Sequence, residues 1–294
     1  MAARPRLIVP LRRPPEEEAA ARAAAPPHLT YHGGPLLTNV EVFTIFWGAA
    51  WQDPAQVGLV NQVNQFFDFI LTSSLLDLLA EYGVPGKAIG HGKRTGTKTI
   101  TASEPGGGTG TIDDTGIQQA LQGWIADGTV PQPTANSLYF LYFPPGVTIT
   151  LQGQASCQVF CGYHNVVGGN VYYAVEPYIT CAGCTFGQII DSLTKVSSHE
   201  LCEAITDPAL TGWIDDNSGN EIGDICNSTT ATLGGYTIQD EWSNTANACL
   251  DAPAGTTPAP TPTPTPSPGP TPPPGPTPTP PPPTPTPPPP SRPR

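Results

Sequence analysis

The sequence predicts a single layered domain of the α/β or α+β class, with a mixed sheet and flanking helices. Stretches rich in β-branched and aromatic residues alternate with stretches in which apolar residues recur every three or four positions. The composition also changes sharply at both ends, which leaves roughly 225 residues for one domain with its own core. We therefore expect a disordered segment at 1–27, a globular domain at 28–254 and a disordered Pro/Thr-rich linker or tail at 255–294.

The first half of the domain is predicted to alternate strands with helices. Residues 38–47 are β-branched and aromatic with partial alternation, as in a central strand. Asp53-Pro54 is a favourable helix start, and the apolar spacing after it predicts one long or two shorter helices over 55–82. Residues 98–103 favour a short strand, and 113–126 favour a helix with one apolar face.

The second half is predicted to contain several strands and one further long helix. The apolar and aromatic run at 137–143 ends at Pro-Pro-Gly, which is typical of a buried strand. The remaining predicted elements are strands at 147–151, 158–163 and 170–175, a helix at 186–205 and a short strand near 236–238.

The charge of the globular domain excludes some partners. This domain holds only five of the 12 basic residues but 21 of the 24 acidic residues. Such a surface repels phosphate backbones, so we expect no nucleic acid partner, and it attracts cations. No segment is long and apolar enough to span a membrane, and no pattern indicates an oligomeric state.

The cysteines indicate an oxidising compartment. Seven of them lie between Cys157 and Cys249, which predicts a local disulfide framework with at least one thiol left over. We expect one of the bridges to join Cys202 to Cys226. The apolar run Leu7–Leu11 is too short for the core of a signal peptide, yet the cysteines and the tail favour a secreted or cell-surface protein.

The helix at 186–205 carries a His-Glu-x-x-Glu pattern formed by His199, Glu200 and Glu203. Positions i and i+4 share one face of a helix, so His199 and Glu203 can bind one metal ion, with Glu200 as general base toward metal-bound water. This is the zincin-like arrangement with Glu in place of the second His. We expect zinc, although one His with carboxylates also suits other divalent cations. A plain hydrogen bond between i and i+4 is the alternative.

A catalytic zinc site needs a third protein ligand. Glu221 is our prediction, with Asp224 orienting the site, while Asp224 and Asp207 are the alternative third ligands. The same acidic segment is also compatible with an ordinary turn or a weak calcium loop.

Two other residues near the motif have chemistry of their own. His164 ends a predicted strand and either lines the cleft or is structural, and we favour the structural role. Cys202 lies three residues after His199 on the same helix, which gives poor geometry for a cysteine nucleophile, so a cysteine hydrolase is not expected.

The chain resembles the EXORDIUM-like, or phosphate-induced, protein family over most of the span from about 31 to 250. The resemblance depends on the order of five short segments, which are Tyr31–Leu37, Phe46–Gly48, Cys161–His164, the Cys181/Cys184 pair and Thr206–Pro208. It is closest to the bacterial branch, whose members are similar to this chain at Ser198–Glu200 and at Glu221–Asp224. The resemblance implies a secreted protein associated with the cell wall and with growth signalling, and it names no substrate.

Two functions follow from these patterns. The first is an exported metal-dependent hydrolase, peptidase-like, in which the predicted strand at Val171–Val175 lies at a sheet edge and presents an extended peptide by strand addition. The second is a non-catalytic extracellular module that binds peptide or cell-wall material with the same fold.

Overall fold

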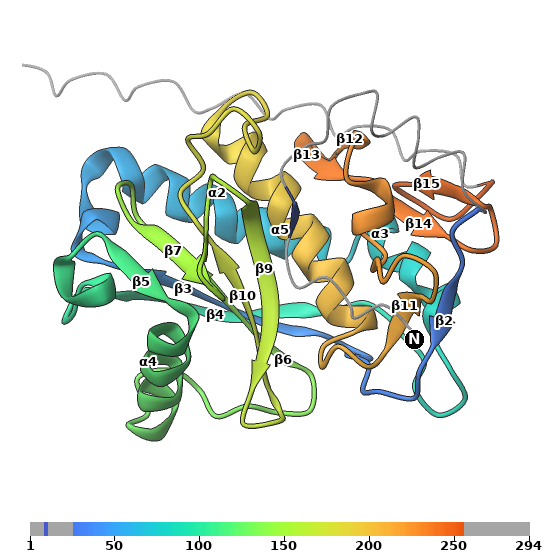
Figure 1. The fold of residues 1–294 in the computed structure, drawn as a ribbon, viewed down its shortest axis with the longest axis horizontal. Coiled ribbons are helices and arrows are strands. Elements are labelled where there is room, and N and C mark those ends of the chain that lie inside the picture. Colours follow the sequence, from blue (N-terminus) through green and yellow to red (C-terminus); the bar gives the residue numbers. More distant parts are fainter. Residues whose placement is uncertain (1–8, 11–25, 256–294) are drawn as a thin grey trace, which may run out of the picture. The chain divides into compact units, whose positions relative to one another are not determined.

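A six-stranded mixed sheet forms the centre of the computed structural model, which describes residues 9–10 and 26–255 (Figure 1). The strand order is β1-β9-β10-β6-β3-β4. β3 pairs in parallel with β4 and β6, β6 pairs in parallel with β10, and β9 is antiparallel to both β10 and β1. The strands are β1 (Val9–Pro10), β3 (Glu41–Trp47), β4 (Lys93–Ile100), β6 (Ser137–Tyr142), β9 (Phe160–Val167) and β10 (Val171–Glu176).

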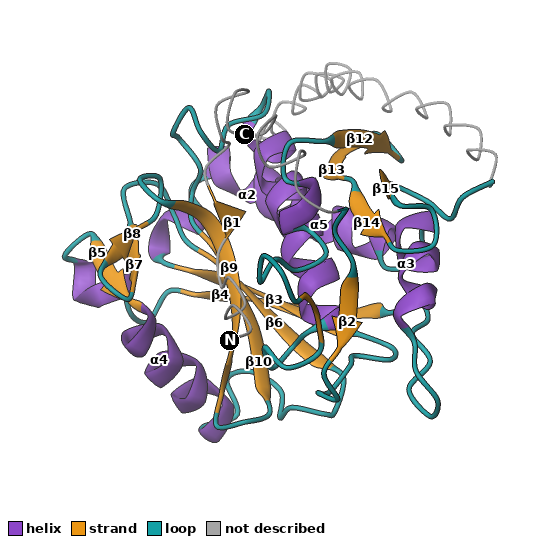
Figure 2. Cartoon of the chain, turned by 45° about the vertical axis from the view of Figure 1, so that its right-hand side comes forward, coloured by secondary structure: helices purple, strands orange, loops and turns teal. Residues whose placement is uncertain are grey.

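Helices cover both faces of this sheet (Figure 2). α4 (Asp114–Ala126) lies on one face, and α2 (Pro54–Ile70) and α5 (Ile189–Thr206) lie on the other. Successive residues of a strand point to opposite faces, and the core is divided accordingly. Along β6, Phe140 and Tyr142 pack with α2 and α5, whereas Tyr139 and Leu141 pack with α4.

The remaining elements are short. α3 (Ser74–Leu78) follows α2 after a break at residues 71–73, where the Ser73 hydroxyl accepts a hydrogen bond from the backbone N–H of Leu75 and so begins the new helix. Small sheets complete the fold, from β2 (Leu29–Tyr31), β5 (Thr111–Asp113), β7 (Thr148–Leu151), β8 (Gln154–Ala155), β11 (Trp213–Asp215), β12 (Thr230–Leu233), β13 (Tyr236–Gln239), β14 (Glu241–Ser243) and β15 (Ala248–Leu250). Within the described residues, 3₁₀ helices lie at Ala49–Gln52, Leu79–Tyr82, Pro105–Gly108 and Asp224–Cys226.

The predicted mixed α/β domain is confirmed, but the predicted place of one strand in the sheet is wrong. β10, which covers the predicted strand at Val171–Val175, is not an edge strand, because it is paired with β9 on one side and β6 on the other. All of its residues are buried. Its backbone groups are used within the sheet, so it cannot accept an added peptide strand. The predicted disordered segments at 1–27 and 255–294 fall largely outside the described residues.

The described residues contain no single helix that is long and apolar enough to cross a membrane. By length and composition alone, α2 together with the segment Ser74–Tyr82 passes the same test as a bent pair.

The disulfides differ from the predicted pairing. The bridges are Cys157–Cys181, Cys161–Cys184 and Cys226–Cys249, and Cys202 is a free, buried thiol. The predicted Cys202–Cys226 bridge is therefore wrong, because Cys226 bonds to a residue of β15. Burial raises the pKa of the Cys202 thiol well above its usual value, which keeps it in its unreactive form.

We predict that Cys202 reacts with an alkylating reagent only after unfolding. Native protein without reductant should incorporate no iodoacetamide, and denatured protein without reductant should incorporate one equivalent per chain, at Cys202. The Cys202→Ser variant should incorporate none in either state. Mass spectrometry that finds no reactive thiol in the denatured wild-type protein would contradict this pairing.

Candidate metal centre

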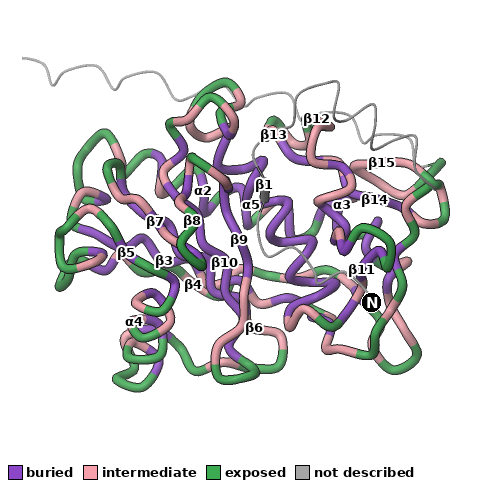
Figure 3. Tube along the Cα trace, viewed as in Figure 1, coloured by how far each residue is buried: buried purple, intermediate pink, exposed green. Residues whose placement is uncertain are grey.

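Helix α5 places the His-Glu-x-x-Glu pattern in the interior of the protein. Gln188 and Asp191 form a capping box at its start, and it ends at Thr206, immediately before Asp207-Pro208. All its residues from Ser192 onward are buried, which is visible in Figure 3. Within it, His199 Nε2 lies 2.9 Å from Glu203 Oε1, the contact expected for positions i and i+4.

Strand β9 brings a second histidine to the same place. His164 is 1% exposed, and its Nε2 lies 3.2 Å from Glu221 Oε1 and 3.6 Å from Glu203 Oε2. Gly162, two residues earlier on the same face of β9, permits the close approach of α5, because a Cβ there would lie 2.7 Å from Val196 Cγ1. The local sequence of β9 therefore sets the distance between His164 and the helix.

The loop after β11 carries the remaining acidic residues back over α5. Asp215 begins this loop by accepting a hydrogen bond from the Ser218 hydroxyl at 2.6 Å, as in an Asx-type turn. Its later residues include Glu221, which is fully buried, and Asp224, whose backbone N–H donates to Glu203 Oε1 at 3.2 Å. The Cys226–Cys249 bridge anchors the end of the loop.

These side chains form what we call the buried cluster, which consists of the buried His164, His199, Glu200, Glu203 and Glu221 together with the half-buried Asp224. Two sets of three have ligand atoms within 4.8 Å of one another, and each set can hold a metal ion. One set is His164, Glu203 and Glu221, and the other is His199, Glu203 and Asp224. Glu203 is common to both.

The structure brings the predicted ligands together in a changed grouping. His199 and Glu203 meet Asp224, whereas Glu221 meets Glu203 and His164. Asp207 belongs to neither set. Its Oδ1 accepts the backbone N–H of Gly212 at 2.6 Å and so holds the turn after α5, while its charge contributes to the raised pKa of both Glu203 and Glu221.

Several buried polar atoms of the cluster have no hydrogen bond. Both oxygens of Glu200, Glu221 Oε2, His164 Nδ1 and His199 Nε2 have no hydrogen-bond partner and are closed off from solvent. Unpartnered buried polar atoms are costly, and buried carboxylates are usually paired or bound to a cation. A divalent cation at Glu203 would compensate the carboxylates that it contacts.

Burial controls the protonation of the cluster. Desolvation raises the pKa of Glu203 and of Glu221 well above the usual value, and nearby carboxylates raise the pKa of Glu221 further. Desolvation lowers the pKa of His164 to about 3 and of His199 to about 4. Both imidazoles are therefore neutral at physiological pH, which is the form that binds metals, and neither supplies a positive charge to the carboxylates.

A second carboxyl group lies close to Glu200 without contacting the metal-binding sets. Glu176 at the end of β10 is fully buried between Tyr142 and Ser197, and neither of its oxygens has a hydrogen bond of ordinary geometry. Desolvation raises its pKa to about 8, and its charge contributes to the raised pKa of Glu200. Glu200 is therefore a carboxyl group held in a dry, acidic environment.

Sequence reasoning missed two members of the site. His164 was expected to be structural, yet it lies beside Glu203 and Glu221. Gln239 of β13 was not singled out, yet its side-chain amide lies 2.7 Å from His199 Nδ1 and donates to the Gly223 carbonyl at 2.7 Å. For His164, the available signal in the sequence was its spacing from Gly162, which places both residues on one face of a strand. For Gln239, the sequence contained no such signal.

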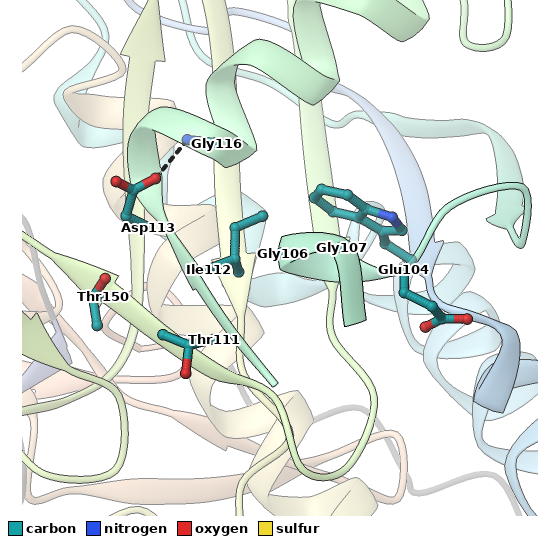
Figure 4. Close-up of a pocket in the computed structure, with 9 residues that line it drawn as sticks. Glu104, Gly106, Gly107, Thr111, Ile112, Asp113, Gly116 and Thr150 are labelled. Atoms are coloured by element: carbon teal, nitrogen blue, oxygen red, sulfur yellow. Dashed lines mark hydrogen bonds between the residues drawn. The ribbon is translucent and has the colours of Figure 1, made fainter. Parts of the chain in front are cut away.

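An open pocket lies elsewhere on the surface and shares no residue with the buried cluster (Figure 4). The Gly106-Gly107 turn and Glu104 line it, and Asp113 stands at the start of α4. Asp113 Oδ1 accepts the backbone N–H of Gly116 at 2.8 Å, so a carboxylate already occupies this helix N-terminus. That arrangement disfavours the binding of phosphate at this helix N-terminus.

Gly223 provides a test of how tightly the loop packs on α5. Its φ of −77° suits any residue, but a Cβ there would lie 2.6 Å from His199 Nδ1. We predict that Gly223→Ala lowers the free energy of unfolding by about 1–3 kcal/mol through overpacking. Gly123→Ala on α4, where a Cβ meets nothing within 4 Å, should leave it unchanged or raise it by about 1 kcal/mol. Equal stability of the two variants in urea unfolding would contradict the packing described.

The comparisons with known proteins agree with the resemblance seen in the sequence. No protein-family model matches the chain. Over an alignment of 255 residues, it is 21% identical to protein EXORDIUM-like 5 of Arabidopsis thaliana, with 71% of this chain and 66% of that protein covered. The chain thus spans slightly less than two thirds of the length of this relative. The match supports a relationship to the EXORDIUM-like family.

Proposed function

We propose that this protein is an extracellular, EXORDIUM-like module whose fold is stabilised by a divalent metal ion bound at Glu203. The observation that carries the proposal is the buried cluster itself. Its two metal-binding sets lie at the junction of α5, β9 and the loop after β11, where carboxylates are desolvated and hydrogen bonds are incomplete. A metal ion there would join three parts of the chain that are distant in sequence.

The donor atoms favour zinc. Neutral imidazole nitrogen and carboxylate oxygen are common zinc ligands, and the same donors also suit manganese or iron. The full burial of Glu203 and Glu221 favours a structural role for the ion, because a catalytic ion needs a coordination position that substrate can reach.

The extracellular location is supported by the covalent framework. Three disulfides within one domain are typical of proteins that fold in an oxidising compartment. The acidic composition and the similarity to EXORDIUM-like 5 fit the same location. We propose peptide or cell-wall material as the partner.

We predict that metal removal destabilises the protein. A ligand present at about 100 times its Kd stabilises the native state by about 2.7 kcal/mol, so chelation should lower the Tm of a domain of this size by at least about 5 °C. EDTA already saturated with zinc is the matched control and should have no effect. Glu203→Gln should lose both the metal and the response to chelator, whereas the surface variant Glu41→Gln should keep both. A Tm that is unchanged by chelation would contradict a stabilising ion.

A metal-dependent hydrolase, peptidase-like, is the second candidate, and Glu200 is the observation that favours it. It follows His199 directly on α5, both of its carboxyl oxygens lack partners, and burial raises its pKa well above the usual value. A carboxylate with a raised pKa beside a metal-bound water is suited to act as general base.

The two candidates differ in the expected effect of Glu200→Gln. The hydrolase requires that this variant keeps its metal and loses hydrolysis of a peptide library, while Glu41→Gln keeps both. The structural-metal module requires that the metal-loaded wild-type protein hydrolyses no peptide in the library. Metal-dependent hydrolysis that Glu200→Gln abolishes would therefore replace our first proposal with the second.

A further inference from the structure

We propose that the two metal-binding sets of the buried cluster hold two divalent ions at once, and that the Glu203 carboxylate bridges these ions with one oxygen on each. This inference depends on the proposed metal centre, which it extends from one ion to two. Zinc, manganese and iron all suit a carboxylate-bridged pair with imidazole ligands.

The two sets have matching compositions. Each consists of one histidine, one terminal carboxylate and Glu203, with the three ligand atoms within 4.8 Å of one another. His164 and Glu221 belong to one set and His199 and Asp224 to the other, so the sets share Glu203 alone. Because a carboxylate has two oxygens, both sets can be occupied if each ion takes one of them.

The two oxygens of Glu203 face different histidines. Oε1 lies 2.9 Å from His199 Nε2, whereas Oε2 lies 3.6 Å from His164 Nε2. The backbone N–H of Asp224 also donates to Oε1 at 3.2 Å, and a carboxylate oxygen has a second lone pair that remains for an ion. The orientation of Glu203 therefore directs one oxygen into each set.

The distances between the ligand atoms suit shared ions. Two ligands at about 2.1 Å from one zinc are about 3.0–3.4 Å apart, depending on the angle between them. The 2.9 Å between Glu203 Oε1 and His199 Nε2 is close to this range, yet His199 Nε2 has no hydrogen-bond partner. His164 Nε2 lies 3.2 Å from Glu221 Oε1, a contact that also has hydrogen-bond geometry, and 3.6 Å from Glu203 Oε2.

Unpartnered polar atoms lie in both sets. His199 Nε2 in one set and Glu221 Oε2 in the other have no hydrogen bond and are closed off from solvent. Both side chains are 0% exposed. An ion in only one set would leave the unpartnered atom of the other set buried and uncompensated, whereas two ions would relieve both.

The surrounding charges also favour two ions. At least five carboxyl groups act on one another here, while the ammonium of Lys195 acts on three of them with the opposite sign. These carboxyl groups are Glu200, Glu203, Glu221, Asp224 and Glu241. One divalent ion together with Lys195 offsets three negative charges, and a second ion brings this to five.

The zinc content of the full-length protein tests the dinuclear centre. After saturation with zinc and removal of loosely bound ions by gel filtration, elemental analysis should find two zinc ions per wild-type chain. Zinc-edge X-ray absorption should show zinc–zinc scattering at about 3.5–4 Å, the spacing of the ions in known two-metal sites.

Single substitutions should separate the two ions. Glu221→Gln and Asp224→Asn each remove the terminal carboxylate of one set, so each variant should hold one zinc and lose the zinc–zinc signal. Glu203→Gln removes the bridge and should lose both ions. The surface variant Glu41→Gln is the matched control and should keep two zinc ions and the zinc–zinc signal.

Three results would contradict the dinuclear centre in different ways. A wild-type protein that saturates at one zinc would overturn it and leave the proposed function intact. Two ions without a zinc–zinc signal, or a Glu203→Gln variant that retains two, would overturn the bridge. A wild-type protein that binds no zinc, manganese or iron would refute the proposed metal centre itself. The wild-type measurements decide this even if a variant fails to fold.

Discussion

The burial of the Glu203 carboxylate is the constraint on which the rest of this structure depends. Its side chain is 1% exposed at the junction of helix α5, strand β9 and the loop after β11. A buried carboxylate needs a compensating charge or a full set of hydrogen bonds. Its neighbours His164 and His199 are both neutral at physiological pH, so they supply hydrogen bonds or ligand atoms but no positive charge. The Lys195 ammonium lowers the pKa of Glu203, but desolvation outweighs it, and a divalent cation would supply further positive charge.

The fold positions each part of the cluster by a separate local feature. Gly162 on β9 and Gly223 in the loop both lie where a Cβ would collide with residues of α5, so the three elements approach more closely than larger residues would allow. The Cys226–Cys249 bridge anchors the loop beside Asp224, and Gln239 fixes the ring of His199. These contacts come from segments distant in sequence, which is the arrangement expected of a site that stabilises a fold.

The regular elements were predictable from the sequence because their patterns are local. The aromatic and β-branched run before Trp47 and the apolar period of α5 determine element type without reference to the rest of the chain. Strand order is not local. The pattern of Val171–Val175 fits an edge or a central strand equally well, and only the pairing with β9 and β6 decides between them.

The same limit applies to the candidate site. The contact between His199 and Glu203 follows from helical geometry, so the sequence could predict it. The approach of His164 and Gln239, and the pairing of Cys226 with Cys249, depend on how β9, β13 and β15 pack against α5 and the loop. Cysteine spacing alone cannot determine connectivity, and a lone histidine at a strand end has no local signature of a ligand.

We propose a metal-stabilised extracellular module rather than an open catalytic cleft. Anomalous diffraction from crystals of the zinc-loaded protein tests this description most directly. We predict a zinc-edge anomalous peak beside Glu203, between the ligand atoms of at least one of the two metal-binding sets. No anomalous peak in the buried cluster, with the carboxyl groups of Glu203 and Glu221 bonded directly to one another or to water, would contradict it.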